Sequence, residues 1–195
     1  MSSREKILAR LHNNRPDPDQ YPLPSIPPLG ERTATRQKFE ENLKALGGQV
    51  LEQQTWETLE QAIKRYFPHE KVICSAVPEF CGTIRVDELT SPQQADKVDV
   101  LVVRSPFGIA ETGSIFLSEE ELHSLNSVAH LTQHIVVLLS ENDLVANMHV
   151  AYEQRAEFHH ARYGVLMSGP SATADIQGVL IRGAQGVRTL SIWWE

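Results

Sequence analysis

The sequence predicts an α/β fold built around an open, mainly parallel sheet with helices flanking both of its faces. Compact apolar runs rich in β-branched residues occur at 71–76, 98–103 and 135–139. They do not alternate strictly between apolar and polar residues, and this is typical of strands buried on both faces of a parallel sheet. Segments of helical periodicity separate the runs, as the crossover connections between parallel strands require.

The composition is that of one globular domain. The chain has 195 residues, 41% of them hydrophobic and 22% charged, so it can bury a sizeable core without disulfides or a structural metal. Lys and Arg number 18 against 25 Asp and Glu, a net charge of −7, which disfavours nucleic acid and anionic membranes as partners. The six-residue separation of Cys74 and Cys81 fits neither a zinc site nor an iron–sulfur ligand run. The sequence therefore predicts no metal and no cofactor in this chain.

The N-terminal residues mix charged side chains into every helical turn and lack the apolar stretch of a signal peptide. No later run approaches the ~18 uninterrupted apolar residues of a membrane span. We therefore expect a cytoplasmic protein whose thiols are reduced.

Residues 1–31 are expected to form an N-terminal arm and linker, and residues 32–195 a single domain. The arm should contain a short amphipathic helix over residues 3–13, after two serines that can cap it. The apolar residues at helical spacing are Ile7, Leu8 and Leu11. Six prolines follow the helix and predict an extended linker. The arm is either disordered or docks on a partner or a second subunit.

The first half of the domain should alternate helices and short strands. Apolar residues spaced four and three apart predict a helix over 33–46 that ends at a pair of glycines, and residues 49–52 can only form a short strand. A second helix is predicted from a cap at Thr55, through Trp56, to a stop at Pro68.

The second half should contain a right-handed strand–helix–strand unit over residues 134–168. Its helix is predicted to start from a cap within 140–143 and to run to the next apolar strand, 165–167. The residues that mark the buried face of this helix are Leu144, Met148 and Tyr152. A terminal pair of strands, 179–181 and 188–194, should close the chain around a glycine-containing turn.

Parallel α/β sheets bind ligands at the carboxyl ends of their strands, and two loops there carry suitable side chains. The first, residues 108–114, combines glycines, hydroxyls and one carboxylate, which can present backbone N–H groups and an acid to a small anion or carbonyl. Its candidates are Glu111 as the catalytic carboxylate, and Thr112, Gly113 and Ser114 as ligand-binding residues. The alternative is a tight β-connection whose hydroxyls satisfy local backbone groups.

The second loop, residues 168–175, follows the predicted strand 165–167 and should lead into a short helix. The N–H groups at a helix start attract a carboxylate or a phosphate. The candidate ligand-binding residues of this loop are Gly169, Ser171, Thr173 and Asp175. The alternative is purely structural, with Ser171 as the helix cap and Asp175 in the first turn.

Two further residues could contribute to the same site. The eight histidines show no metal-ligand spacing. Of these, His134 is the one that we expect to reach a crevice, because it begins a predicted buried strand. Arg188 can supply positive charge to an anionic ligand, or it forms an ion pair with a nearby carboxylate. Neither loop matches a P-loop, a dinucleotide-binding fingerprint or a nucleophile elbow, so the chemistries of those motifs lack support.

Four motifs, taken in order, resemble those of the LUD domain family, and in particular its lactate utilization protein C type. They are Ile109–Ser114, His134–Val137, Ser168–Ile176 and Gly183–Leu190. The resemblance covers residues 32–195 and is most specific in the third motif. It implies a fold similar to the NagB, RpiA and CoA-transferase group. It also implies a setting in which several proteins oxidise lactate to pyruvate and the iron–sulfur clusters are held by partner proteins.

The sequence leaves three functions open. The first is a component without clusters in a lactate-oxidising system, in which the Glu111 and Ser171 loops hold a small carboxylate or stabilise a partner. The second is a free-standing enzyme of the CoA-transferase or isomerase kind with Glu111 as nucleophile or general base. The third is a regulatory module that binds a small anion. The predicted site requires Glu111 to face a helix start at Ser171–Thr173, with Arg188 nearby.

Overall fold

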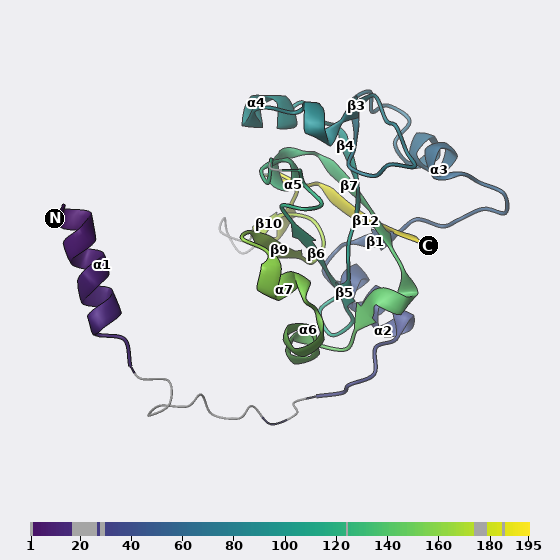
Figure 1. Ribbon diagram of the computed structural model, residues 1–195. Helices are drawn as coiled ribbons and strands as arrows, with labels where there is room; N and C mark the ends of the chain where they lie inside the picture. The colour runs from purple at the N-terminus through teal and green to yellow at the C-terminus, as the bar shows by residue number, and fades with distance from the viewer. Residues whose placement is uncertain (1, 17–26, 28–29, 124, 174–178, 185) are drawn as a thin grey trace.

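A parallel sheet forms the centre of the molecule in the computed structural model (Figure 1), which describes residues 2–16, 27, 30–123, 125–173, 179–184 and 186–195. Within those residues the sheet has six strands, and all its pairings are parallel. Their order across the sheet is β1 (Gln49–Val50), β12 (Thr189–Trp194), β7 (His134–Leu139), β4 (Val100–Arg104), β2 (Ile73–Ser75) and β3 (Ile84–Arg85). The predicted open, mainly parallel α/β fold is confirmed.

Both faces of this main sheet are covered. On one face, α3 (Leu59–Tyr66) and the connection from β2 to β3 pack Ile63 and Phe80 against Val100 and Val136. The other face is covered by α2 (Arg36–Ala45), α4 (Pro92–Ala95), α5 (Val128–Leu131) and the 3-10 turn η1 (Val86–Glu88). Apolar side chains alternate between the two faces along each central strand, which explains why the strand sequences show no polar face.

A second sheet packs on the α2 side of the main sheet. It consists of β8 (Leu144–Val145), β5 (Gly108–Ile109), β6 (Ser114–Ser118) and β9 (Gly164–Met167), in that order. Ile115 and Leu117 of β6 point into the core shared with the main sheet, whereas Phe116 points outward. The outward face is covered by α6 (Met148–Gln154), and α7 (Glu157–His160) contributes the ring of Phe158.

The predicted strand–helix–strand unit over 134–168 is wrong, because β9 lies in the second sheet, where it pairs antiparallel with β6. The helix also starts later than predicted. Ser140 does cap a turn, but that turn is the short 3-10 helix η2 (Glu141–Asp143), and Leu144 belongs to β8. The α-helix begins at Met148 after the cap Asn147. Pairing of β8 with β5 overrides the local capping signal.

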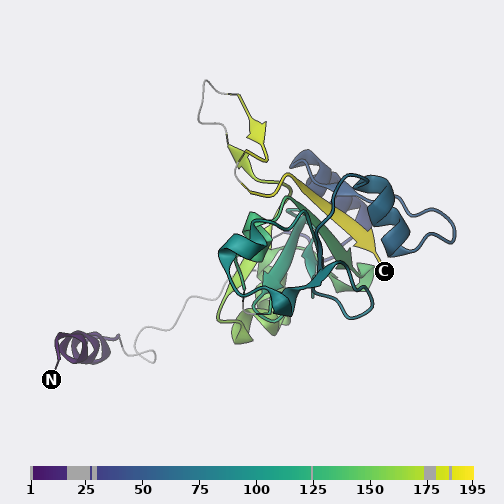
Figure 2. The same cartoon turned by 90° about the horizontal axis from the view of Figure 1, so that it is seen from above.

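Two further predictions need correction. The helix expected from Thr55 begins instead at Leu59, where Thr58 is the cap, and Trp56 is 94% exposed with a φ of 68°. The expected terminal pair of strands does not form. β11 (Ile181–Arg182) pairs with β10 (Ala172–Thr173), and this small hairpin stands out from the body in Figure 2, whereas β12 enters the main sheet between β1 and β7.

The predicted N-terminal helix is confirmed as α1 (Ser3–Asn13), with Ser2 and Glu5 forming a reciprocal capping box. None of its residues is buried, and it stands apart from the rest of the chain in Figures 1 and 2. Most of the predicted linker lies outside the described residues. Glu31 contacts the domain, because its carbonyl oxygen accepts a hydrogen bond from the side-chain amide of Asn147. Among the described residues, no helix has both the length and the apolar character needed to cross a membrane.

Candidate functional site

The first predicted loop is the turn of a β-hairpin between β5 and β6, pressed against α2. Gly113 adopts a φ of 59°, and a Cβ atom there would lie 2.2 Å from the backbone nitrogen of Leu43. The side-chain amide of Asn42 donates to the carbonyl oxygens of Ala110 and Glu111, at 2.8 and 2.9 Å. Glycine is therefore required at position 113 by the approach of the helix as well as by the turn.

Glu111 is exposed, and its backbone is engaged in the hairpin. Its N–H donates to the carbonyl oxygen of Ala146, at 3.0 Å. Its carboxylate adds to the field that raises the pKa of Lys38, whose main partner is Glu31. In the described part of the chain, no hydrogen bond or ion pair joins Glu111 to the second predicted loop or to Arg188. The structure therefore does not assemble the site that the sequence predicted around this carboxylate.

The hydroxyls of the two loops do meet, under the C-terminal end of α2. Thr112 Oγ1 and Ser114 Oγ lie 2.6 Å apart, and Ser114 Oγ lies 2.5 Å from Ser168 Oγ. Ser114 is buried. Gly169, at a φ of 76°, comes so close to α2 that a Cβ atom would lie 2.6 Å from the carbonyl oxygen of Leu46. These hydroxyls bond to one another, which supports the structural alternative of a tight β-connection.

The predicted helix start in the second loop is wrong. Ala172 and Thr173 form β10, and Ser171 sits before it with its N–H donating to Val187 and its carbonyl accepting from Gly183, at 2.8 and 2.7 Å. The anion-binding argument from a helix dipole consequently does not apply to Ser171 and Thr173. The candidate Asp175 lies outside the described residues.

His134 and Arg188 lie at the amino ends of β7 and β12, so they are at the opposite end of the strands from the carboxyl ends. His134 Nδ1 is 2.8 Å from the hydroxyl of Thr189, and Nε2 is 3.5 Å from Glu70 Oε1. Burial lowers the pKa of His134, and Arg188 lowers it further, against the raising effect of Glu70. Arg188 is exposed and forms no ion pair with the residues that the structure describes. The alternative of an ion pair is therefore not observed among those residues, and the role of Arg188 toward an anionic ligand stays a prediction.

The topology marks a different place for a site. The connection from β2 to β3 crosses the α3 face, whereas the connection from β4 to β7 crosses the opposite face. The direction of winding therefore reverses between the neighbouring strands β2 and β4. Ligands of open α/β sheets bind at the carboxyl ends of the strands beside such a reversal.

Arg104 ends β4 at this reversal and binds two carboxylates. Its Nε and one terminal nitrogen donate to both oxygens of Glu195, at 3.0 and 2.6 Å, and it also contacts Glu79 from the β2–β3 connection. Arg104 lowers the pKa of Glu79. This cluster was not predicted from the sequence, although an arginine directly after the apolar run 98–103 indicates a charge at a strand end.

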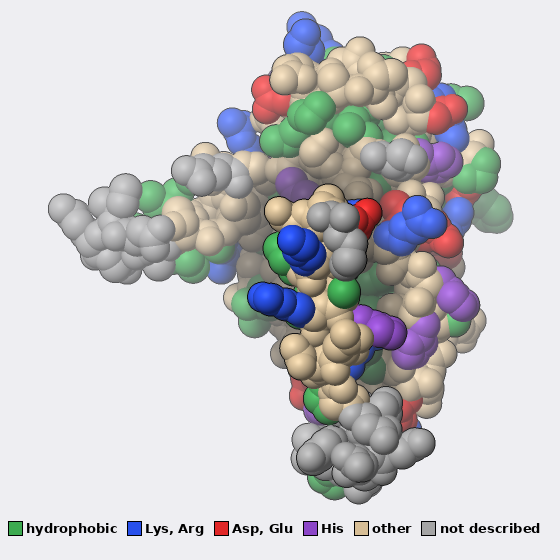
Figure 3. Space-filling model, turned by 60° about the vertical axis from the view of Figure 1, so that its left-hand side comes forward, with side chains coloured by type: hydrophobic (Ala, Val, Ile, Leu, Met, Phe, Trp, Pro, Cys, Tyr) green, Lys and Arg blue, Asp and Glu red, His purple; other side chains and the backbone are tan. Residues whose placement is uncertain are grey.

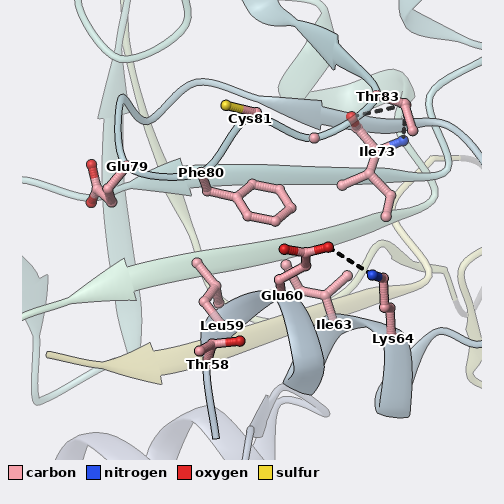
Figure 4. Close-up of a pocket in the computed structure, with 11 residues that line it drawn as sticks. Thr58, Leu59, Glu60, Ile63, Lys64, Ile73, Glu79, Phe80, Cys81 and Thr83 are labelled. Carbon is pink, nitrogen blue, oxygen red and sulfur yellow. Dashed lines mark hydrogen bonds and ion pairs between the residues drawn. The ribbon is translucent and has the colours of Figure 1, made fainter.

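A cavity of about 660 Å³ extends from Glu79 between α3 and the β2–β3 connection (Figure 4). Its walls are largely apolar, and an ion pair of 2.6 Å between Glu60 and Lys64 lies on the α3 side. The residues that line it are Thr58, Leu59, Glu60, Ile63, Lys64, Ile73, Glu79, Phe80, Cys81, Gly82 and Thr83. Such a volume far exceeds that of a three-carbon acid and lies within the range of ligand-binding cavities.

The two thiols differ in their surroundings. Cys81 is exposed on the wall of this cavity, whereas Cys74 is buried in β2. Burial raises the pKa of Cys74 to about 12. A thiol reagent should therefore label Cys81 selectively. Among the described residues, no three His, Cys, Asp or Glu side chains are grouped so that they could hold a metal ion.

A family model named LUD domain matches residues 87–192, more than half of the chain. The chain belongs to the LUD domain family. The matched segment contains both sheets from β4 to most of β12, and it includes Arg104 and Glu111. The two carboxylates that bind Arg104 lie just outside it, in the β2–β3 connection and at position 195.

The fold of this LUD domain is also found in a solved structure, that of a DUF162 family protein from Deinococcus radiodurans. The two chains share 15% sequence identity and superpose with a TM-score of 0.58, over 81% of this chain and 94% of the other. At that identity the likeness shows the fold alone. No curated protein matches the sequence.

The surface of the LUD domain carries charges of both signs. On the face shown in Figure 3, acidic, basic and histidine side chains are interspersed with apolar ones over the described residues. A ligand on this face would therefore be bound by local groups rather than by a broad field of one sign.

Proposed function

We propose that this LUD domain protein is a component without iron–sulfur clusters of a cytoplasmic system that oxidises lactate to pyruvate, with the clusters held by partner proteins. Family membership supports the setting. The cysteine content supports the division of labour, because the chain has two cysteines and Cys74 is buried, while a cluster is usually held by four thiolates.

We infer that the protein binds a small carboxylate, such as that of lactate or pyruvate, through Arg104. The observation that carries this proposal is the position of Arg104 at the carboxyl end of β4, beside the reversal in winding. Glu195 already engages the guanidinium through two hydrogen bonds, which is the geometry in which a ligand carboxylate would bind. Glu79 is the group that a ligand would displace, since it lies on a connection rather than on a strand.

The enzyme alternative with Glu111 as nucleophile has less support. A catalytic carboxylate needs hydrogen-bond donors placed around the reacting atoms. Glu111 is exposed on a hairpin turn, and its described neighbours are Lys38, the side-chain amide of Asn42 and the backbone carbonyl of Ala146. A purely regulatory module would use the same Arg104 site, so growth and binding must be measured separately.

The binding proposal is tested with the variants Arg104→Gln and Glu79→Gln and the matched control Arg32→Gln, which removes an exposed pair with Glu153 elsewhere. Calorimetry with lactate and with pyruvate should show binding weakened at least about tenfold in Arg104→Gln, the scale of a lost charged hydrogen bond. Glu79→Gln should bind as tightly as the wild type or more tightly, because a competing charge is removed. Equal binding by Arg104→Gln and the control would remove Arg104 from the site.

The role in lactate oxidation is tested by growth on lactate in a strain that depends on this protein. Deletion should abolish growth, and Arg104→Gln should fail to restore it at wild-type protein levels. Growth without the protein would exclude it from the lactate system. Growth lost in Glu111→Gln, at unchanged melting temperature, would instead favour the enzyme alternative. Co-purification of a tagged protein with iron-containing partners from lactate-grown cells tests the proposed assembly.

A further inference from the structure

The helix α1 carries an apolar stripe that nothing in the described chain covers. Ile7, Leu8 and Leu11 are 59%, 49% and 63% exposed, and none of the residues in α1 is buried. The helix is nevertheless well specified, because a reciprocal capping box starts it. A short amphipathic helix gains most of its stability from packing of its apolar face, so the stripe requires a surface to dock on.

The charge of the arm points to the surface that it fits. Residues 2–16 contain four basic side chains and one carboxylate, a net charge of +3. Since the whole chain carries −7, the remainder carries −10. Arg4 lies three and four positions before Ile7 and Leu8, so it shares the apolar face of the helix. The arm therefore fits an apolar groove bordered by carboxylates. The remainder of this chain, with its net negative charge, could offer such a groove to the arm of another copy or to its own arm.

The cavity between α3 and the β2–β3 connection has these properties. Leu59, Ile63 and Phe80 supply apolar walls, and the carboxylate of Glu60 projects from α3 toward the side of Phe80 and Ile73, as Figure 4 shows. Glu79 adds a second carboxylate at the end nearest Arg104. Among the described residues, Glu60 forms an ion pair with its helical neighbour Lys64, an exposed contact that costs little to rearrange.

The arm leaves the body far from this cavity. Glu31 is held by Asn147 at the start of α6, which covers the outer face of the second sheet. The cavity lies on the α3 face of the main sheet, so both sheets separate the two places. The 17 residues from 14 to 30 span at most roughly 60 Å when fully extended, and a chain's own arm would use much of that length to pass around the sheets. A second copy has no such restriction.

We propose that α1 of one copy docks in the cavity between α3 and the β2–β3 connection of a second copy. The stripe of Ile7, Leu8 and Leu11 packs on Leu59 and Phe80, and Arg4 pairs with Glu60. The exchange is reciprocal about a twofold axis, so each dimer contains two docked arms. Two weak contacts acting together give a stable pair, and high salt weakens it because charge attraction contributes.

Sedimentation of the full chain and labelling of Cys81 test this directly, since Cys81 lines the cavity and Cys74 is buried. Mass should rise from monomer to dimer between on the order of 1 and 100 µM protein at low salt. Over the same range the labelling rate of Cys81 should fall at least about fivefold. The double variant Ile7→Asn with Leu11→Asn should stay monomeric and label rapidly, whereas Ala9→Asn with Asn13→Gln, on the opposite side of α1, should behave as the wild type.

A charge exchange distinguishes this contact from other modes of association. Glu60→Arg and Arg4→Glu should each weaken the dimer, and the two together should restore it, whereas Glu41→Arg on α2 makes the same change in net charge without effect. A monomer at all concentrations with Cys81 shielded by the chain's own arm would overturn the proposal. A dimer insensitive to the α1 variants, or a monomer with unshielded Cys81, would overturn it as well. None of these outcomes depends on lactate, so the proposed function stands or falls separately.

Discussion

The strands of the main sheet can be predicted from the sequence more readily than those of the second sheet. The centre of the main sheet is built from continuous apolar runs such as 135–139 that are buried on both faces, while its edge strands β1 and β3 are two residues long. The second sheet is built from strands as short as two residues, and β6 carries side chains for two different cores. A buried run identifies a strand by itself, but only the tertiary pairing identifies the sheet to which a short strand belongs.

The second sheet is nonetheless part of the same core. Ile115 and Leu117 of β6 pack in the cluster that contains Leu101 and Ile135 of the main sheet. A domain with one shared core unfolds as a unit. The two sheets therefore differ in how well they can be predicted from the sequence, but we expect them to contribute equally to stability.

The largest expected effect tests this equality. Leu101→Ala in β4 and Leu117→Ala in β6 each remove a fully buried side chain, and each should lower the free energy of unfolding by ~2–5 kcal/mol. Urea unfolding should remain a single transition in both variants. The control Leu180→Ala alters a side chain that is 56% exposed and should cost little. Two separate transitions in Leu117→Ala would show that the second sheet is an independent unit.

A smaller effect tests how tightly the second sheet is joined to α2. Gly113 and Gly30 both have positive φ, 59° and 76°. A Cβ at Gly113 would lie 2.2 Å from the Leu43 backbone, whereas a Cβ at Gly30 would meet, among the described residues, the side chain of Asn147 alone, at 3.4 Å. Gly30→Ala should cost about 1–2 kcal/mol, from the left-handed backbone alone. Gly113→Ala should cost about 2 kcal/mol more, because α2 must move. Equal losses in the two variants would mean that the hairpin turn is not held against the helix.

The sequence predicted the fold class and the central strands, because burial on both faces leaves a signal within each strand. It also identified Ser140 as a cap, but it could not show that the turn would be cut short by pairing of Leu144 with Gly108. Thr173 was placed at a helix start because its pairing partner, Ile181, could not be recognised from the pattern.

The site was predicted less well than the fold, for a related reason. The predicted residues are conspicuous in composition, but their contacts are mostly to local backbone groups and α2. Arg104 gains its environment from Glu79 and Glu195, which are 25 and 91 positions away in the chain. No periodicity links residues at such separations, so the cluster became visible only with the strand order.

The smallest effect concerns His134, the first residue of the central strand β7, whose position was predicted correctly from the sequence. Burial is the main cause that lowers the pKa of His134 below its ordinary 6.5. The unfolded chain therefore binds the proton more readily than the folded one, so this contribution to stability is present above pH ~6.5 and is lost as the pH falls toward the lowered value. His134→Gln should flatten that part of the profile of unfolding free energy against pH. Thr189→Val removes the hydroxyl beside Nδ1 but keeps the burial, so it should retain the pH dependence. Nuclear magnetic resonance titration of the His134 ring provides the direct measurement, and a pKa at or above 6.5 would show that the attraction of Glu70 outweighs burial.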